Sequence, residues 1–358
     1  MSISATEIET IIKQAALDAG FDLCGIAPAA DSRELGYFPE WIAAGRAAEM
    51  KYMEARDDAG HLKRSSLSRV APWARSAIVC AINYNTADPY STECHDSRRG
   101  WISRYAWSRE DYHDAVLRRL KKIEAKLKEA SPDLATRSYV DTGPIVERVF
   151  AKYAGVGWIG KNTCIINQQK GSWLFLGVIL TSLELQPDIP APDRCGTCTR
   201  CIEACPTDAL VAPYQLDSNK CISYLTIEKR GSIPEDLREG MGHHVYGCDI
   251  CQDVCPWNRK APVTSASEFE PRPGLVNPAL DWLAETSAEE FREKFRGSPI
   301  RRAKHSGLRR NAVIAMGNSR NPEFLPLLRK LTCDEDEVVS ESARWASARL
   351  KPSDKSSR

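Results

Sequence analysis

The feature that most constrains this chain is a dense run of cysteines near its middle. The segment CGTCTRCIEACP spans residues 195–206 and places four cysteines at spacings of x2, x2 and x3, followed by proline. A second segment, CDICQDVCP at 248–256, repeats the x2 and x3 spacings with one cysteine fewer. Thiolates at these spacings ligate ferredoxin-type iron–sulfur clusters, whereas structural zinc sites favour two separated cysteine pairs. We therefore predict two 4Fe–4S clusters and keep paired zinc sites as the alternative.

The number of cysteines agrees with two clusters. Two 4Fe–4S clusters need eight thiolates, and eight of the 13 cysteines lie between 195 and 255. In ferredoxin-type runs the cysteine before the proline ligates the other cluster. This rule assigns to the first cluster Cys195, Cys198, Cys201 and Cys255. It assigns to the second cluster Cys205, Cys248 and Cys251, with Cys221 completing the set by elimination. The scattered cysteines, which we expect to be small buried apolar residues, are Cys24, Cys80, Cys94, Cys164 and Cys333.

The bulk composition bounds the class of protein. With 358 residues the chain is too long for one ordinary core, so we expect two or three domains. The formal net charge of +1 argues against a globally basic nucleic-acid binder, and a polyanion must be met by a local patch. The N-terminus lacks the features of a signal peptide, and the most apolar stretch, WLFLGVIL at 173–180, is too short to span a bilayer. We expect a cytoplasmic protein with no membrane span, in which thiols stay reduced.

The region before the cysteines mixes strand and helix patterns. Apolar residues at helical spacing predict a helix over 6–19 with Thr6 as its N-cap, and a longer helix over 110–130. Strand-like runs occupy 76–84, 136–140 and 173–182. We expect a mixed α/β or α+β fold whose domains cover 1–185, then a ferredoxin-like domain at 186–270, then a helical segment at 271–358. The glycine motifs of the common nucleotide cofactors are absent from the sequence.

Two stretches of this region carry groups suited to chemistry. In YVDTGPIVER, Asp141 ends a predicted strand beside a turn, where a carboxylate can face a cleft, and Arg148 follows shortly after. The alternative is that Asp141 caps a helix beginning near Pro144. In GVGWIGKNTCIINQQKGSW, four glycines accompany Lys161 and Asn162 in a loop before a buried strand. Such a loop either lets the backbone approach a bulky ligand or forms a plain surface hairpin.

Two basic segments could contact a polyanion. RRGWISRYAWSREDYH interleaves arginines with aromatics, which either stack bases or pack beneath a solvated basic face. Residues 296–310 hold six Arg or Lys and no acid, a patch that contacts phosphates or is merely solvated. Three apolar-periodic segments, separated by Gly317-Asn318 and by 332–336, resemble one HEAT-type unit. These segments are 308–316, 323–331 and 337–350.

The order of these motifs resembles that of the epoxyqueuosine reductases. Asp141 in VDTGPIVER, the loop GWIGKNTCIINQQKGSW, the cysteine segments and GLRRNAVIAMGN carry the resemblance over nearly the whole chain. The resemblance implies reduction of an epoxide in transfer RNA to give queuosine, with cobalamin and two 4Fe–4S clusters. It implies a cobalamin-binding domain akin to that of reductive dehalogenases and a HEAT-like segment touching the RNA. It also implies a monomer and an external electron donor. The alternatives are a reductive dehalogenase of a small molecule and an electron carrier.

The resemblance also assigns residues. Asp141 matches the family's proton donor, a role that needs a protonated carboxyl, and we expect burial against the corrin to raise its pKa. The residues expected to line the same pocket are Arg64, Arg104, Tyr105, His113, Arg148, Lys161, Asn162 and Ser172. Arg64 lies where the family has an Arg before Asp-Pro, and this chain lacks that Asp-Pro. The residues expected to contact transfer RNA are Arg301, Arg302, Lys304, Arg309 and Arg310.

Overall fold

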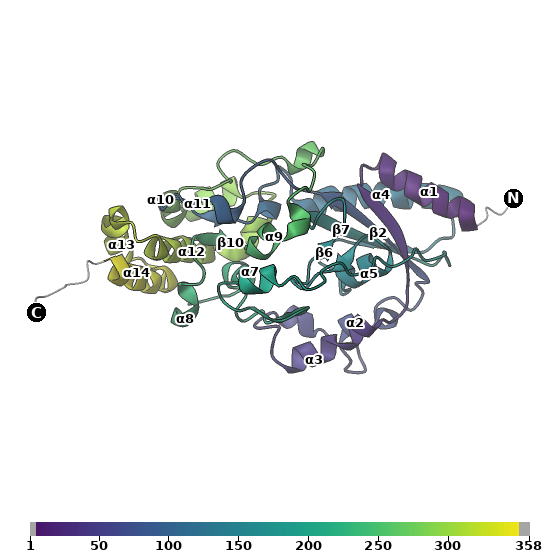
Figure 1. Cartoon of the computed structure of the whole chain (residues 1–358), viewed down its shortest axis with the longest axis horizontal. Coiled ribbons are helices and arrows are strands. Elements are labelled where there is room, and N and C mark those ends of the chain that lie inside the picture. Colours follow the sequence, from purple (N-terminus) through teal and green to yellow (C-terminus); the bar gives the residue numbers. More distant parts are fainter. Residues whose placement is uncertain (1–4, 351–358) are drawn as a thin grey trace, which may run out of the picture.

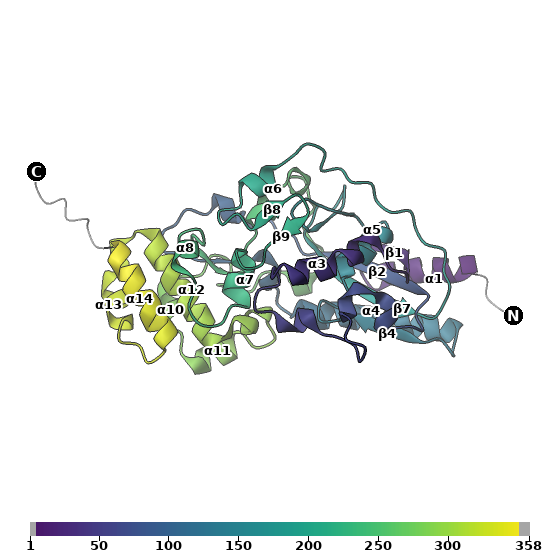
Figure 2. The same ribbon diagram turned by 90° about the horizontal axis from the view of Figure 1, so that it is seen from below.

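The computed structural model describes residues 5–350, which form an elongated molecule (Figures 1 and 2). The N-terminal sheet and helix α1 (Ala5–Asp18) lie at one end, and helices α13 (Leu325–Leu331) and α14 (Glu337–Leu350) lie at the other. The short elements that carry the two cysteine segments lie between them. The predicted electron-transfer segments are therefore flanked by a sheet on one side and helices on the other.

A four-stranded antiparallel sheet forms the framework of the N-terminal half. Its order is β1-β2-β7-β4, and each neighbouring pair is antiparallel. The strands are β1 (Leu23–Pro28), β2 (Ser76–Asn83), β4 (Thr136–Tyr139) and β7 (Leu174–Thr181). Because the pairing is antiparallel, this half is an α+β arrangement rather than a parallel α/β one.

The two faces of the sheet form separate cores, because successive side chains of a strand point to opposite sides. On β2, Ile78 and Ile82 face a core shared with α1 and with α4 (Tyr112–Ala130). Val79 of the same strand faces a core shared with α5 (Glu147–Tyr153). The sheet therefore fixes the positions of α4 and α5, whose N-termini carry the candidate active site.

Short elements connect the sheet to the helical end. Strand β10 (His244–Tyr246) pairs in parallel with β3 (Trp101–Ile102). The other strands form hairpins, β5 (Trp158–Ile159) with β6 (Ile165–Ile166) and β8 (Leu210–Ala212) with β9 (Gln215–Leu216). The short helices are α2 (Arg33–Gly36), α3 (Phe38–Ala43), α6 (Arg200–Glu203), α7 (Ile222–Ile227), α8 (Glu235–Arg238) and α9 (Ile250–Asp253).

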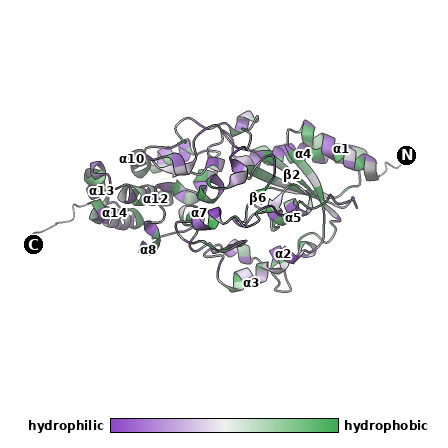
Figure 3. Ribbon diagram, viewed as in Figure 1, coloured by the Kyte–Doolittle hydropathy of each residue, from purple (hydrophilic) through white to green (hydrophobic). Residues whose placement is uncertain are grey.

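The helical end has its own core, and part of the N-terminal half belongs to it. Besides α13 and α14, its helices are α10 (Leu280–Glu285), α11 (Ala288–Lys294) and α12 (Lys304–Ser319). Trp101 and Trp107 are fully buried within this core. They pack beneath the surface, so the packing interpretation of these two aromatics is the one the structure supports. Figure 3 shows that hydrophobic residues also dominate the central strands of the sheet.

The predicted strands and the long helix are confirmed, and two predictions of helix ends are wrong. Strands β2, β4 and β7 and helix α4 lie within the predicted ranges. Helix α1 begins at Ala5, so Thr6 lies inside it rather than at its N-cap. Helix α12 continues through Gly317 and Asn318, where we expected a break. Gly317 is needed there because a Cβ atom would lie 2.9 Å from Ala346 of the adjacent α14. Among residues 5–350, no helix has the length and apolar character needed to cross a membrane.

Two arginines that we predicted to contact RNA are structural instead. Arg310 is 1% exposed, and its guanidinium donates to three backbone carbonyl oxygens in and after α7. Arg309 donates to the carbonyl of Ala284 and forms an ion pair with Asp334. The prediction for both residues is wrong, because their donors already hold α12 against its neighbours within the protein.

Replacing Arg310 with alanine should destabilise the protein. The change leaves one buried and two partly buried carbonyl oxygens without their donor, so we expect a loss of about 2–4 kcal/mol in the free energy of unfolding. Arg301→Ala is the control, since Arg301 is exposed and should change stability by less than about 0.5 kcal/mol. Anaerobic urea unfolding measures both, and equal midpoints for the two variants would contradict the structural role.

Candidate active site

Asp141 lies on a short loop between β4 and α5 and adopts an unusual backbone conformation. Its φ is +57°, in the left-handed region that side chains other than glycine seldom occupy. Helix α5 has Val146 as its N-cap, without a side-chain cap, so Asp141 does not cap this helix. Backbone strain of this kind costs about 1–3 kcal/mol and persists where surrounding contacts hold it.

Three neighbours hold the Asp141 loop. The Tyr112 hydroxyl donates to Oδ2 of Asp141 at 2.8 Å, and Nε2 of His113 lies 3.5 Å from the same oxygen. The backbone N–H of Asp141 donates to Oε1 of Glu147 at 2.6 Å. Asp111, the N-cap of α4, orients His113 through a contact of 2.7 Å to Nδ1. The N-termini of α4 and α5 therefore converge on one carboxylate.

The protons of this site reside on the neighbours of Asp141. Burial acts to raise the pKa of Asp141, but hydrogen bonds from His113 and Tyr112 outweigh it and hold that pKa below its ordinary value. Burial acts to lower the pKa of His113, but Asp111 and Asp141 raise it to about 9. Burial, together with the charge of Asp141, raises the pKa of Glu147 to about 8. The expectation that burial against the corrin raises this pKa concerns the cofactor-bound site and stays a prediction. Within the protein itself, His113 places a cation beside the carboxyl. The side chain of Asp141 is 66% exposed, so it remains accessible to a substrate.

Three further predicted pocket residues lie near this loop. Arg64 donates to the carbonyl oxygens of Tyr52 and Gly143, at 2.6 and 3.0 Å. The Tyr105 ring meets the Tyr112 ring edge-on, with centroids 5.9 Å apart. Arg148 donates to the carbonyl of Thr163, and its charge contributes to the lowered pKa of Asp141.

Arg104 does not line the pocket, and this prediction is wrong. It is 1% exposed and donates to the carbonyl oxygens of Thr86, Asp88 and Pro89. Its guanidinium also stacks against the rings of Tyr90, Trp107 and Trp173. All of these partners are protein groups, so Arg104 is a structural arginine.

The other three predicted pocket residues contact the cysteine segments. Lys161 donates to the carbonyl oxygens of Gly196 and Cys198, at 2.7 and 3.0 Å. Buried Asn162 donates to the carbonyl of Cys251, and the hydroxyl of Ser172 accepts from Gln252 and Asn258. The loop that carries Lys161 and Asn162 is a hairpin of β5 and β6, and it joins the sheet domain to the cluster segments.

Contacts among the eight clustered cysteines link members of each predicted set. Cys195 and Cys255 pack together against Trp158 and Trp257, and Cys201 is in electrostatic contact with Cys195 and Cys198. Cys221 and Cys248 share a second cluster, and both are in electrostatic contact with Cys205. Cys251 is in contact with Cys248 and Cys221. These pairwise contacts agree with the two sets of four that the crossover spacing predicts. Within residues 5–350, however, no three of the Cys, His, Asp or Glu side chains are arranged to hold a metal ion, so the assignment of the eight ligands stays a prediction.

The chemistry of these groups fits iron–sulfur clusters. Burial, followed by the charges of Cys195 and Cys201, raises the pKa of Cys255 to about 11. Burial also raises the pKa of Cys248 well above its usual value. Gathered, buried thiols ionise only beside a compensating positive charge, which a cluster of iron ions provides. Backbone N–H groups also face the sulfurs, as where Ala209 donates to Sγ of Cys205 at 3.3 Å.

Two buried carboxylates tie the second cysteine segment to the N-terminal half. Asp249 accepts from the Trp101 indole, the Ser103 hydroxyl and the backbone N–H of Arg104. Asp253 accepts from the backbone N–H and the hydroxyl of Ser91. These contacts fix the cysteine segment against the segment that leads into α4, and thereby against the Asp141 site.

The scattered cysteines have several environments. Cys80 is buried and faces Cys24 across strands β1 and β2, as expected for a small core residue. Cys333 is exposed, so the expectation of burial is wrong for it. Cys164 forms a hydrogen bond with the thiol of Cys251. Its position next to a candidate ligand results from the hairpin fold and could not be read from its sequence spacing.

Sequence reasoning missed several residues of this site. Asp111 and Tyr112 precede His113 directly, and Glu147 lies between Asp141 and Arg148 in the stretch already singled out. Their position in the sequence could have identified them. Polar residues in the first turns of two helices can contact the same loop. Tyr52 lies far from these motifs in the sequence, and only the fold brings it near Arg64.

Comparison with protein families gives two matches. Residues 194–258 match a 4Fe-4S double cluster binding domain. Residues 64–142 match the family described as epoxyqueuosine reductase QueG, DUF1730. The first match supports iron–sulfur clusters over the zinc alternative for the cysteine segments.

Similar proteins cover nearly the whole chain. An epoxyqueuosine reductase of Xanthomonas campestris pv. campestris is 38% identical over 348 residues, 96% of each chain. The crystal structure of an epoxyqueuosine reductase with an epoxyqueuosine-modified tRNA-Tyr stem loop is 32% identical, with a TM-score of 0.86 over 98% of this chain and 92% of the other. An epoxyqueuosine reductase from Bacillus subtilis, whose catalytic aspartate loop is swung out of the active site, is 31% identical with a TM-score of 0.86, over 97% and 91% of the two chains.

Replacing Asp111 with asparagine should lower the pKa of His113. Asparagine still caps α4 but removes one of the two carboxylates that stabilise the imidazolium, so this pKa should fall from about 9 toward its ordinary range. NMR titration of the His113 ring measures the change. Asp114→Asn is the control, because Asp114 is exposed in the same helical turn, and an equal effect of both variants would contradict the specific contact.

Proposed function

The chain belongs to the epoxyqueuosine reductase family, and we propose that it reduces epoxyqueuosine to queuosine in transfer RNA. It is an oxidoreductase of tRNA modification. The observation that carries the proposal is that one chain combines an accessible carboxylate on a constrained loop with a segment that matches a 4Fe-4S double cluster binding domain. The first provides a group for proton transfer, and the second provides sites for electron transfer.

The reaction needs both kinds of group. Removing the epoxide oxygen breaks two C–O bonds and leaves a carbon–carbon double bond. The balance requires two electrons and two protons, and the oxygen departs as water. A protein that performs this reaction must deliver single electrons from its clusters and place protons at the leaving oxygen.

The cofactors are two 4Fe–4S clusters and cobalamin. The clusters use the two cysteine sets assigned above, and the match to a 4Fe-4S double cluster domain supports this. Cobalamin requires an open face beside the acid, and the exposed Asp141 carboxylate leaves such a face. When bound, the corrinoid supplies a strongly reducing low-valent cobalt for the electron transfer to the epoxide.

The residues around Asp141 divide the proton chemistry among them. His113 passes its proton to Asp141 across the 3.5 Å contact, and Asp141 delivers that proton to the departing oxygen. Tyr112 orients the carboxylate, and Asp111 orients His113. Glu147 holds the backbone of Asp141 and carries a further proton at neutral pH. The site thus stores the two protons of the reaction on groups that touch Asp141.

The helical end serves the RNA substrate. Helices α12, α13 and α14 form one HEAT-like unit between Lys304 and Leu350. They belong to the last of three proposed domains, which are the cobalamin domain at 1–185, the cluster domain at 186–270 and the RNA-contacting domain at 271–358. Arg301, Arg302 and Lys304 are exposed at the start of α12 and contact the RNA. The solved relative in complex with a tRNA stem loop supports an RNA-binding role for this fold.

We further infer that the protein acts as a monomer in the cytoplasm, where its transfer-RNA substrate resides. An external one-electron donor must reload the clusters, since the reaction consumes two electrons per turnover.

Replacing Asp141 with asparagine should abolish turnover while leaving the clusters in place. Asparagine keeps the shape and the tolerance of a left-handed backbone but cannot pass a proton, so we expect a loss of about 100-fold or more. Anaerobic single turnover of an epoxyqueuosine stem loop with cobalamin and a chemical reductant measures the rate, and iron content is the control. A fully active variant with intact clusters would refute the assigned role.

The rate of turnover should fall as the pH rises through 8 to 9. Glu147 and His113 have raised pKa values, so both hold protons below about pH 8 and lose them as the pH passes about 8 and about 9. Glu147→Gln should remove the first of these two steps and leave the second. Glu235→Gln, at the equivalent first position of α8, is the control. Identical pH profiles for wild type and Glu147→Gln would exclude Glu147 as a proton store.

A further inference from the structure

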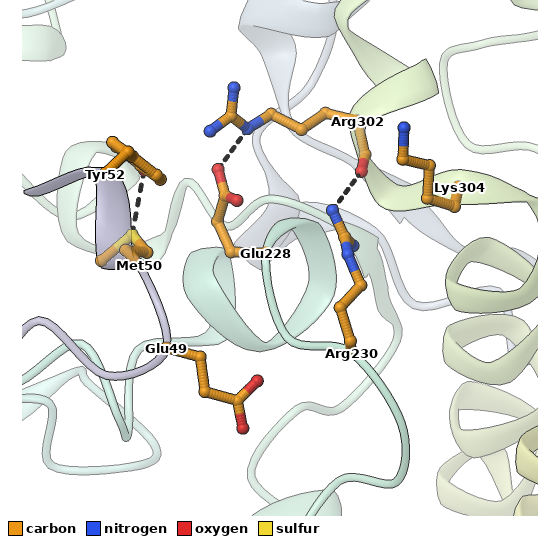
Figure 4. Close-up of a pocket in the computed structure, with 7 residues that line it drawn as sticks. All are labelled: Glu49, Met50, Tyr52, Glu228, Arg230, Arg302 and Lys304. Atoms are coloured by element: carbon orange, nitrogen blue, oxygen red, sulfur yellow. Dashed lines mark hydrogen bonds and ion pairs between the residues drawn. The ribbon is translucent and has the colours of Figure 1, made fainter.

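A pocket lies where three distant segments of the chain meet, close to the Asp141 loop. The residues that line this hollow of about 330 Å³ are Glu49, Met50, Tyr52, Glu228, Arg230, Arg302 and Lys304. Figure 4 shows the Arg302 and Lys304 side chains on one side of this hollow and the Tyr52 ring on the other. Its volume falls in the range of about 300–1,000 Å³ that is typical of small-ligand sites.

The charges of the pocket leave two cations available. Both carboxylates in its lining are already paired, Glu228 with Arg302 and Glu49 with Lys229. Within residues 5–350, neither Arg230 nor Lys304 forms an ion pair. Arg230 donates only to backbone carbonyls, which fix its guanidinium without neutralising it. The pocket therefore contains the fixed positive charge of Arg230 and the positive charge of the flexible Lys304 side chain. Two such cations can bind a phosphate group.

The Tyr52 ring is a stacking surface held in place. It is 44% exposed, and the guanidinium carbons of Arg302 and Arg64 lie 5.2 and 5.8 Å from its centroid. Arg64 also binds the Tyr52 carbonyl and the carbonyl of Gly143, two residues beyond Asp141. An aromatic ring fixed beside basic groups is the arrangement that binds unpaired bases of single-stranded RNA.

We propose that this pocket binds one nucleotide of the RNA next to the nucleotide that reaches Asp141. Its phosphate contacts Lys304 and Arg230, and its base stacks on Tyr52. The inference rests on the proposed function, because it assumes that an RNA loop delivers its modified base to Asp141. It adds a second site of recognition, built from residues that no motif in the sequence brings together.

The test measures RNA binding separately from reduction. Fluorescence anisotropy with an unmodified anticodon stem loop and the anaerobic, cluster-loaded protein reports affinity without needing turnover. Tyr52→Ala should weaken binding about tenfold or more, and Tyr52→Phe, which keeps the ring, should bind like wild type. Lys304→Ala should reduce the salt dependence of the affinity by about one phosphate contact.

Matched controls separate a specific site from general effects. Tyr37→Ala removes another exposed tyrosine with an arginine over its ring, and Lys294→Ala removes another exposed lysine. Both should bind RNA like wild type. Unchanged affinity for Tyr52→Ala and Lys304→Ala would overturn the inference, as would equal losses in the controls or a loss in Tyr52→Phe. If wild type binds the stem loop through these residues but does not reduce the epoxide, the pocket stands and the proposed function fails.

Discussion

The packing of the second cysteine segment against the N-terminal half depends on two buried carboxylates within that segment. Asp249 and Asp253 lie among the candidate cluster ligands, and burial raises the pKa of both. Buried carboxyl groups are tolerated only where donors surround them. Here the donors come from Ser91 and from Trp101 to Arg104, segments that precede α4. The cost of leaving these acids unsatisfied therefore locks the electron-transfer segment to the helix that carries His113 and Tyr112.

The same use of buried polar groups explains which residues could be predicted from the sequence. Strand periodicity placed β2 and β7, and cysteine spacing assigned both sets of thiols, because these patterns are local. The roles of the arginines, in contrast, depend on contacts with distant segments of the chain. We predicted that Arg104 and Arg310 bind cofactor or substrate, yet the terminal guanidinium nitrogens of both donate to backbone carbonyls of other segments. An arginine's role depends on what surrounds it after folding, and a single sequence does not contain that information.

The protonation state of Asp141 also depends on groups that only the fold brings together. From the sequence we expected burial against the corrin to favour the neutral form of this carboxyl. In the structure, an imidazolium and a tyrosine hydroxyl on the same oxygen reverse that effect. The charge of Asp141 in turn helps to keep Glu147 protonated. The neighbouring groups therefore titrate as one coupled set. The pKa values of such a set belong to all of its members, so a proton is not assigned to a single residue.

The position of Asp141 is a compromise between strain and access. A residue with a left-handed backbone conformation returns to a more favourable one unless surrounding contacts hold it. A loop without such contacts would not keep its carboxylate in one orientation. Tyr112, His113 and Glu147 supply that opposition from two helices, while the carboxylate itself stays exposed. Arg64 adds a contact from a third direction, through the carbonyl of Gly143. Because the same guanidinium binds the carbonyl of Tyr52, a shift of the loop that moves Gly143 is expected to disturb the pocket proposed to bind RNA. The Arg64 side chain therefore connects the Asp141 loop to the pocket that contains Tyr52. The orientation of the Asp141 carboxylate consequently depends on the geometry of that pocket.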